Sequence, residues 1–339
     1  MAGLIRAVSW NLLDYGRAGE DPARIERVHQ VIIGEREAAR AEGDAVVLAV
    51  QELIAAGEDK ARLAGRRLRE LGEATGLCCD RAPNTPAVAV GNLEFHTGLL
   101  WTDGLDPVGG WAEISGVDIR HSLAMLHFDV GTGQPVMHAS YHAPPWGKYR
   151  RADEAERVAA AMTLPGDRPP GLVGGDWNAP SADRVLRRGW VTEDDLVPDE
   201  RRYYDDDPFR GTEAWDGQFV HQTRWKRAKA ADLRWASRTA AVGDILSWRA
   251  EREPGEILAA GGLRDVAAEL NHQPWTATTG HWNGGADPYP PRRIDRWHVT
   301  GELLPALVGY RVIDSDLALA ASDHLPVVAV YDPRLVSGA

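Results

Sequence analysis

Pro170-Gly-Leu-Val-Gly-Gly-Asp-Trp-Asn178 is the stretch of this 339-residue chain that points most directly to a fold. It begins as a short apolar run of strand length and ends in two polar side chains, Asp176 and Asn178. The end of a strand is a rigid place from which a side chain can be presented to a shared site. An Asp-x-Asn pair on its own is more often a simple turn, so the pattern gains meaning only if it recurs.

The same pattern, an apolar strand-like run, recurs along the chain. The expected strands are 5–13, 44–52, 96–101, 122–130, 135–142, 170–178, 292–300, 310–314 and 325–331. Helical spacing of apolar residues follows the cap Asp21-Pro22, ends at Gly43, and returns over about 57–75 and 149–163. Strands that cluster in runs, with helices at intervals, indicate sheets packed face to face and flanked by helices.

Polar side chains at the strand ends form a chemically consistent set. They are Asn11, Gln51-Glu52, His142, Asp176 with Asn178, and Ser322-Asp323-His324, and Asp295 lies inside a sixth run. Each alone has a structural explanation as a turn, cap or buried residue. Together they offer oxygen ligands, two histidines and amide donors, without the cysteine set or His-x-x-x-His pattern of a zinc site.

This set suits hydrolysis of a phosphoester with an ion of the magnesium type. Mg²⁺ prefers oxygen ligands and takes one or two carboxylates from the protein, a role for Glu52. His142 and Asn178 can donate to the phosphoryl oxygens as negative charge spreads over them. Asp176 and His324 are the candidates that align or deprotonate the attacking water, and Asp295 can fix the tautomer of His324.

The ordered motifs resemble the endonuclease/exonuclease/phosphatase superfamily, typified by pancreatic-type deoxyribonuclease and the apurinic endonucleases. The motifs are Ser9-Trp10-Asn11, Gln51-Glu52, Ser140-Tyr-His142, Gly174-Gly-Asp-Trp-Asn178, Arg293-Ile-Asp295 and Ser322-Asp323-His324. Gly-Asp-x-Asn followed much later by Ser-Asp-His is the specific part. The resemblance implies an α+β fold, a four-layer αββα sandwich of two packed mixed β-sheets flanked by helices, with the site in a cleft at one edge.

The resemblance also implies a role for each matching residue. Glu52 is expected to be the principal ligand of Mg²⁺, with Mn²⁺ as the alternative ion and with Asn11 and Asp323 near the same ion. His142 and Asn178 are expected to hold the phosphate, Asp176 to orient or activate the water, and His324 paired with Asp295 to act in acid–base chemistry or phosphate binding. The division of the base role between Asp176 and His324 stays open, because coupled groups need not titrate separately.

One departure from the family pattern concerns the position two residues after Asn11. Some relatives have an aspartate there, whereas this chain has Leu13. Asp14, one step further along, is expected to point to the opposite face of the strand. A second metal site near Asn11 is therefore not expected.

Further residues are candidates for substrate binding at the rim of the cleft. Trp146 follows His142 in the turn Pro144-Pro-Trp-Gly147 and is expected either to contact the leaving group or to cap a helix of the next layer. His281 precedes Asp295 on an expected loop, either at the rim or in solvent.

A charged excursion at about 191–252 interrupts the alternation of strands and helices. Residues 192–207 carry eight acidic against two basic side chains, and residues 221–238 carry six basic against one acidic. Arg224, Lys226 and Arg227, with tryptophans interleaved, form either a nucleic-acid-binding surface or an exposed helical face. Because site residues come from both ends of the chain, we expect a single domain over 1–339 with this excursion beside its core.

Composition and net charge limit the class of protein and the partners that we expect. The chain is 44% hydrophobic and 26% charged, as in an ordinary soluble globular protein. Its net charge of −12 argues against a general attraction to nucleic acid or to an anionic membrane, though not against a local basic patch. Cys78 and Cys79 make no disulfide framework and no secretory or membrane-spanning segment is apparent, so we expect a cytoplasmic protein that does not act at a membrane. No protein partner is inferred.

The substrate stays open, because one fold of this kind hosts several activities. A nucleic acid backbone or a nucleotide is favoured by the basic, tryptophan-containing stretch. The alternative is a small-molecule phosphatase or phosphodiesterase acting on a sugar phosphate or a lipid head group, which would suit an acidic body and use the excursion as a lid. A non-catalytic binding module on the same fold is expected to have lost one of Glu52, Asp176, Asn178 and His324, and all four are present.

Overall fold

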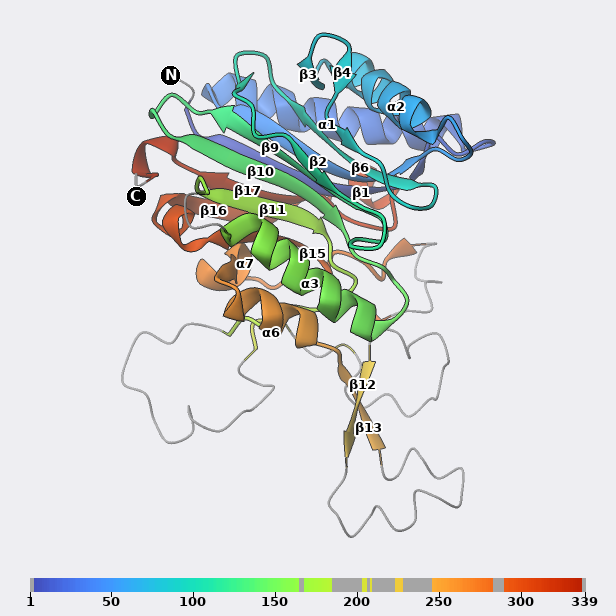
Figure 1. Cartoon of the computed structure of the whole chain (residues 1–339), viewed down its shortest axis with the longest axis vertical. Helices are drawn as coiled ribbons and strands as arrows, with labels where there is room; N and C mark the ends of the chain where they lie inside the picture. Colours follow the sequence, from blue (N-terminus) through green and yellow to red (C-terminus); the bar gives the residue numbers. More distant parts are fainter. Residues whose placement is uncertain are drawn as a thin grey trace.

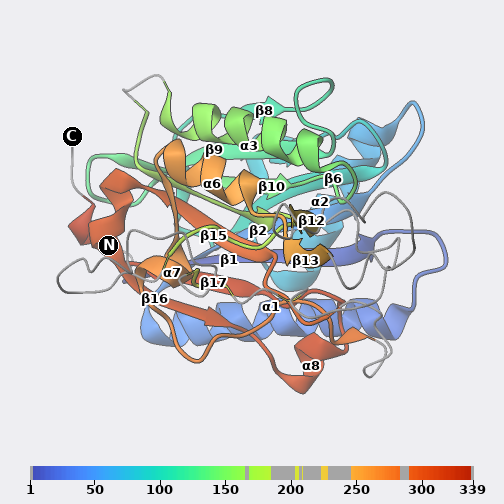
Figure 2. The same cartoon turned by 90° about the horizontal axis from the view of Figure 1, so that it is seen from below.

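Two mixed β-sheets packed face to face form the centre of the molecule. The structure is a computed structural model that describes residues 3–164, 168–184, 203–205, 208, 223–227, 246–282 and 290–336; the side chains of 148, 223–227 and 246–249 are not described. Figure 1 shows helices α1 and α2 on one side of the sheets and α3 and α6 on the other, and Figure 2 shows the same layers from below. The expected α+β sandwich of two sheets flanked by helices is confirmed.

The first sheet joins strands from both ends of the chain. In order across the sheet, it contains β16 (Leu307–Val312), β17 (Val327–Tyr331), β1 (Ile5–Tyr15), β2 (Ala45–Ile54), β6 (Phe95–Trp101) and β5 (Val88–Ala89). β1 and β2 are parallel, with Ile5 opposite Ala45 and Asn11 opposite Gln51, while the other pairings are antiparallel. The parallel pair brings the ends of β1 and β2 to the same edge of the sheet.

The second sheet repeats this arrangement with one parallel pair at its centre. In order across the sheet, it contains β14 (Leu263–Asp265), β15 (Asp295–Thr300), β11 (Gly171–Asp176), β10 (Pro135–His142), β9 (Ser122–Asp129) and β7 (Asp106–Pro107), and β8 (Ala112–Ile114) also pairs with β9. β10 and β11 are parallel, with His142 opposite Asp176. Two short ladders lie outside the sheets, β3 (Asp80–Ala82) with β4 (Thr85–Pro86) and β12 (Thr223–Arg227) with β13 (Leu246–Ala250).

Local sequence signals explain where the main helices begin and end. In α1 (Pro22–Glu42), the Asp21 side chain accepts a hydrogen bond from the backbone N–H of Ala23, and Gly43 ends the helix in the left-handed conformation at φ 78°. The other helices of the described ranges are α2 (Lys60–Thr75), α3 (Lys148–Thr163), α6 (Glu253–Ala260) and the short α7 (Val266–Glu269) and α8 (Asp316–Leu319), and the 3₁₀ turns there are Gly301–Ala306 and Pro333–Leu335. None of the helices in the described ranges combines the length and the apolar character needed to cross a membrane.

Three apolar layers hold the four structural layers together. One lies between the sheets and includes Val47, Phe128 and Trp297. The second packs the first sheet against α1 and α2, and the third packs the second sheet against α3 and α6. Gly174 allows close contact of the sheets, because a Cβ there would lie 2.7 Å from the Trp297 ring and 2.8 Å from Cβ of Ser9.

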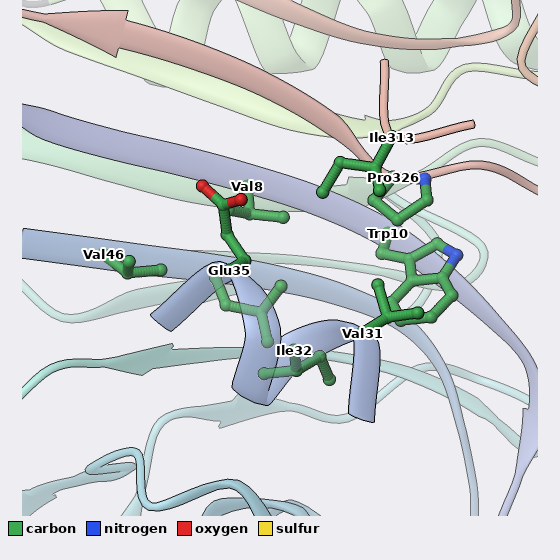
Figure 3. A pocket seen from close by; sticks show the side chains of 9 residues that line it. Val8, Trp10, Val31, Ile32, Glu35, Val46, Ile313 and Pro326 are labelled. Atoms are coloured by element: carbon green, nitrogen blue, oxygen red, sulfur yellow. The ribbon is translucent and has the colours of Figure 1, made fainter. Parts of the chain in front are cut away.

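Trp10 connects the helix layer to the edge where β1 ends. Its ring is fully buried beside Val31 of α1 and lines a small cavity of about 10 Å³, which has room for at most one water (Figure 3). The indole Nε1 donates a 2.9 Å hydrogen bond to the backbone carbonyl of His324. This hydrogen bond attaches the loop before β17, which carries His324, to the layer between the first sheet and α1.

The expected strands and helices of the core are confirmed with small shifts of their ends, and most of the charged excursion lies outside the described residues. Within 191–252 the structure describes 203–205, 208, 223–227 and 246–252. Arg224, Lys226 and Arg227 lie on β12, so the expectation of a helical face is wrong for this segment. Their side chains lie outside the described part of the structure.

Candidate active site

The ends of the two parallel strand pairs meet at one edge of the sandwich. Asn11 ends the regular pairing of β1 beside Gln51, and His142 and Asp176 end β10 and β11 opposite each other. Asp295 begins β15 directly opposite Asp176. The sequence motifs are therefore adjacent in space because strand register aligns them.

Buried hydrogen bonds connect the two sheets below this edge. Gln51 Nε2 donates to Ser140 Oγ at 3.0 Å, and Ser140 Oγ donates to the carbonyl of Val50 at 2.9 Å. Ser322 Oγ donates to the carbonyl of Asn11 at 2.8 Å and accepts from the N–H of His324 at 3.2 Å. The bonds of Ser140 link the two sheets, and the bonds of Ser322 attach the loop before β17 to the end of β1, so both support the polar side chains at this edge.

The side-chain amide of Asn11 links two carboxylates from different sheets. Its Nδ2 donates to Glu52 Oε1 at 3.1 Å and to Asp176 Oδ2 at 3.2 Å, and its Oδ1 accepts from the N–H of Leu13 at 3.1 Å. Glu52 Oε2 accepts from the N–H of Asp14 at 2.9 Å. In this orientation the nitrogen of Asn11, and not its oxygen, faces the carboxylates, so the amide must turn over to act as an oxygen ligand.

Backbone strain is concentrated at this cluster. Glu52 has a φ of 63° and Asn178 a φ of 49°, and Leu13 and Asp14 also have positive φ values. Such conformations cost energy in residues other than glycine and are common where side chains are held for function. The pairing of β1 with β2 shifts between Asn11 and Tyr15, so strict strand alternation does not apply to Asp14, whose carboxylate accepts from Arg17 Nη2 at 2.8 Å.

Asp176, Asn178 and His142 form the next part of the site. Asp176 Oδ1 accepts from the N–H of Asn178 at 2.9 Å, an Asx turn, while Asn178 Nδ2 donates to Asp176 Oδ2 and to the carbonyl of Ala143. His142 is buried, and its Nε2 lies 3.6 Å from Asp176 Oδ2 and 3.9 Å from Glu52 Oε1. The Asp-x-Asn pair therefore forms a turn and also contributes its side chains to the polar site.

His324 is paired with Asp295 on the other side of Asp176. Its Nδ1 lies 2.9 Å from Asp295 Oδ2, and its Nε2 lies 3.8 Å from Asp176 Oδ2. Thr278 Oγ1 donates to the same Asp295 oxygen at 2.6 Å. A hydrogen bond from Nδ1 to Asp295 leaves Nε2 of His324 facing Asp176.

Burial and neighbouring charges shift the pKa values of the site residues in opposite directions. Burial and then the charge of Asp323 raise the pKa of Glu52 to about 7. Burial also raises the pKa of Asp176, although His324 opposes this. Burial disfavours the imidazolium of His324, but Asp295, Asp323 and Asp176 outweigh it and hold its pKa well above the usual value. Burial, with His121 and His324 nearby, holds the pKa of His142 well below its usual value.

The donor set fits a hard divalent cation. Glu52 and Asp176 are carboxylates with raised pKa values that share a single amide donor, so an excess of negative charge faces the space around Asn11. Asp323, whose side chain is one-third exposed, adds a further carboxylate close enough to affect Glu52. A group of Asp176, Asp295 and His324 has ligand atoms within 4.8 Å of one another. Oxygen-rich sites of this kind suit Mg²⁺ or Mn²⁺.

The proposed substrate-binding residues occupy different positions. His281 Nε2 lies 3.0 Å from the carbonyl of Ser322, so it contacts the loop that carries Asp323 and His324. Trp146 is half exposed at the start of α3 and lines a surface pocket. Thr278, His121 and Phe95 were not expected at the site: Thr278 contacts Asp295, and the rings of His121 and Phe95 lie 4.2 and 6.2 Å from the His142 ring. No spacing in the sequence marks Thr278, whereas Phe95 begins β6 and His121 directly precedes β9, so both of these lie at the start of a strand.

Comparisons with known proteins agree with this architecture. The sequence model described as "Endonuclease/Exonuclease/phosphatase family" matches residues 8–324. No match was found among curated proteins.

Similar solved structures cover almost the whole chain. A protein of this family from Bacteroides thetaiotaomicron has a TM-score of 0.52 at 14% identity, covering 97% of this chain and 98% of its own. The 3′-5′ exonuclease NExo of Neisseria meningitidis has 0.53 at 16% identity, covering 96% and 99%. D. rerio TDP2 complexed with a single-strand DNA product has 0.52 at 13% identity, covering 97% and 99%. At these identities, the likeness shows the fold.

Proposed function

The chain belongs to the endonuclease/exonuclease/phosphatase family of phosphoesterases, and from this premise we propose that it hydrolyses a nucleic acid backbone or a nucleotide with Mg²⁺ as cofactor. The observation that carries the proposal is the hydrogen-bonded cluster of Asn11, Glu52 and Asp176 between His142 and His324. It places acidic and imidazole groups around one space at the edge of the sheets.

Glu52 is the proposed principal ligand of the cation, with Asn11 and Asp323 beside it. When bound there, a divalent cation neutralises charge on the phosphate and lowers the pKa of a coordinated water. Mn²⁺ is the alternative ion, because it accepts the same oxygen ligands.

The chain's own residues supply acid–base groups and donors. Asp295 holds Nδ1 of His324, so that the raised pKa of this histidine keeps a proton on Nε2, aimed at the space beside Asp176. In the proposal, that N–H donates to a phosphoryl oxygen and Asp176 accepts a hydrogen bond from the attacking water. His142 donates to a second phosphoryl oxygen. Asn178 holds Asp176 through two hydrogen bonds and can donate to the phosphate only by releasing one of its present acceptors.

The substrate proposal has its own support. Two proteins of similar fold are described as a 3′-5′ exonuclease and as a complex with a single-strand DNA product, and the basic residues Arg224, Lys226 and Arg227 lie on the chain's excursion. The second candidate is a phosphatase or phosphodiesterase of small molecules, consistent with the net charge of −12.

A chelator experiment tests the metal. We expect Mg²⁺ or Mn²⁺ to support hydrolysis of a DNA oligonucleotide and excess chelator to abolish it, with recovery when Mg²⁺ is added back. Glu52→Gln keeps the shape of the side chain and should lose most of the activity at saturating Mg²⁺. Full activity in chelator would overturn the metal-dependent mechanism.

A substrate panel tests the second half of the proposal. Single-stranded oligonucleotide, plasmid DNA, mononucleotides, a bis-aryl phosphodiester and sugar phosphates are compared at one ionic strength. The proposal requires that a nucleotide-containing substrate has the highest kcat/KM. A sugar phosphate as the best substrate would replace it with the small-molecule phosphatase.

A further inference from the structure

A surface pocket of about 630 Å³ lies where α3 begins. Its walls come from three segments, the turn after β5, the loop between β8 and β9, and the turn after β10 with the first turn of α3. The lining residues with the largest side chains are Asn92, Leu93, Val117, Arg120, Trp146 and Arg150.

Exposed apolar side chains gather in this pocket. Leu93 is 49% exposed, Val117 85% and Trp146 51%, and all three line it. Single exposed apolar residues are ordinary on a protein surface, but several that share one concave wall mark a binding site. About half of the surface of Trp146 is open to solvent, and a planar ring can stack on an exposed part of an indole.

The pocket is basic, although the chain as a whole is acidic. Arg120 and Arg150 line it, and none of the described residues that line it is acidic. Arg150 is committed to Glu154 and to the carbonyl of Val117. The guanidinium of Arg120 has no ion-pair partner within the described ranges, while its backbone N–H donates to Glu154 Oε1 at 2.8 Å. An anionic group beside the apolar wall would give Arg120 a partner.

The three segments that form the pocket are connected to one another and to His142. Asn92 donates its backbone N–H to the carbonyl of Arg120, and the next residue, His121, packs its ring 4.2 Å from the ring of His142. Trp146 follows His142 by four residues, and the turn between them is held by Arg151, whose Nη1 donates to the carbonyl of Pro145 at 2.9 Å. A ligand in the pocket therefore adjoins the side of the site that His142 occupies.

We propose that this pocket binds one nucleotide unit next to the scissile phosphate, with its unpaired base against Trp146 and its phosphate at Arg120. The inference rests on the proposed function for the position of the scissile phosphate, but the pocket's recognition of base and phosphate does not depend on hydrolysis. A sugar phosphate lacks the flat apolar face that Trp146 would cover. A base in a duplex is already stacked on both faces, so the pocket selects single-stranded ends or free nucleotides.

Direct binding to the full chain in chelator tests recognition without turnover. The probes are dAMP and 2-deoxyribose 5-phosphate, which differ only in the base. We expect dAMP to bind more tightly, and Trp146→Ala to weaken dAMP about tenfold without changing deoxyribose phosphate, as loss of one stacking contact predicts. Arg120→Gln should weaken both probes. Tyr149→Ala, which removes a neighbouring exposed aromatic ring that does not line the pocket, is the matched control.

Hydrolysis of oligonucleotides tests the position of the pocket. Replacing one base at a time with an abasic residue should raise KM about tenfold at one position next to the cleaved bond, and Trp146→Ala should abolish that position's effect while leaving the others. The two proposals fail separately. If the protein binds dAMP through Trp146 but hydrolyses no phosphoester, the proposed function is wrong and the proposed nucleotide pocket stands. If the Trp146→Ala variant cleaves DNA with the wild-type KM and binds dAMP with the wild-type affinity, the proposed nucleotide pocket is wrong and the proposed function stands. Equal weakening by Trp146→Ala and Tyr149→Ala also overturns the pocket.

Discussion

His324 shows how much of the site depends on a single residue's neighbours. Its two ring nitrogens face different carboxylates, Asp295 at 2.9 Å and Asp176 at 3.8 Å. Only the first is at hydrogen-bonding distance, so Asp295 sets the tautomer and the orientation of the ring. The second distance leaves the space in which a substrate oxygen or a water can lie.

Asp295→Asn is expected to lower kcat by about 10²–10⁴-fold, the usual range for a lost acid–base contribution. The amide keeps the shape of the side chain but removes the charge that holds the pKa of His324 above its usual value. The measurement is kcat and KM on an oligonucleotide, with circular dichroism to show that the fold is kept. Thr278→Val removes the hydrogen bond to Asp295 Oδ2 and the two that Thr278 Oγ1 accepts from the N–H groups of Ile294 and Asp295, but it leaves the carboxylate charge in place, so its effect on kcat should be much smaller. Equal losses in the two variants would contradict the proposed role of the charge.

At the residue scale, the sequence predicted which side chains lie close together better than it predicted their orientations. Strand-end position predicted the closeness of Glu52, His142 and Asp176, because a strand end presents a side chain in a defined direction. It could not show that the Asn11 nitrogen faces the carboxylates or that Thr278 contacts Asp295, because both depend on loop conformation. The Asp14 prediction assumed strict alternation, which the register shift after Asn11 removes.

At the scale of elements, one buried carboxylate ties the excursion to the second sheet. Asp205 accepts from Arg293 Nε at 2.7 Å and from the N–H of Ser181 at 2.6 Å, and its carbonyl accepts from Arg252 Nη2 at 2.8 Å. Arg293 lies two residues before Asp295, so this network fixes the start of β15. The sequence showed Asp205 only as one of a run of acids, since its partners are far away along the chain.

Asp205→Ala is expected to lower the free energy of unfolding by about 3 kcal/mol, because it leaves part of the buried Arg293 charge unpaired. Because Asp265 still pairs with Arg293, the expected loss of stability is at the lower end of the range for a broken buried ion pair. Urea denaturation followed by circular dichroism measures it. Asp118→Ala removes a half-exposed carboxylate that pairs with Arg157 on the surface and should cost far less. If both variants were equally stable, Asp205 would not be the anchor.

At the scale of the whole molecule, the two parallel strand pairs account for the order of the motifs. Each sheet places its parallel pair near the centre, so ends of strands from residues 5–54 and 135–176 meet at the same edge, and β15 and β17 return the C-terminal motifs to it. We infer that the chain forms one domain around this edge, because neither sheet is complete without strands from distant parts of the sequence. Periodicity predicted the strands; their pairing could not be predicted from it, because register depends on contacts between distant segments.

The same close packing of the sheets predicts how stability depends on pH. His138 lies fully buried between the sheets, its Nε2 3.0 Å from Tyr331 Oη, and burial lowers its pKa to about 3. In the unfolded chain a histidine takes up its proton near pH 6.5, so below that value the unfolded state binds a proton that the folded state does not. His138 therefore stabilises the fold fully above about pH 6.5, and this contribution is lost as the pH falls toward 3.

Between pH 7 and 5.5, this one histidine is expected to lower the free energy of unfolding by about 1 kcal/mol. Glu52, whose pKa is raised to about 7, acts in the opposite direction over the same range, so the difference between wild type and variant is the quantity to measure. His138→Gln can keep a hydrogen bond to Tyr331 and His138→Phe cannot, yet both should reduce the loss of stability on acidification by the same amount. Urea denaturation at the two pH values would contradict the assignment if either variant kept the wild-type difference, since a histidine that is already protonated or exposed in the folded state contributes none.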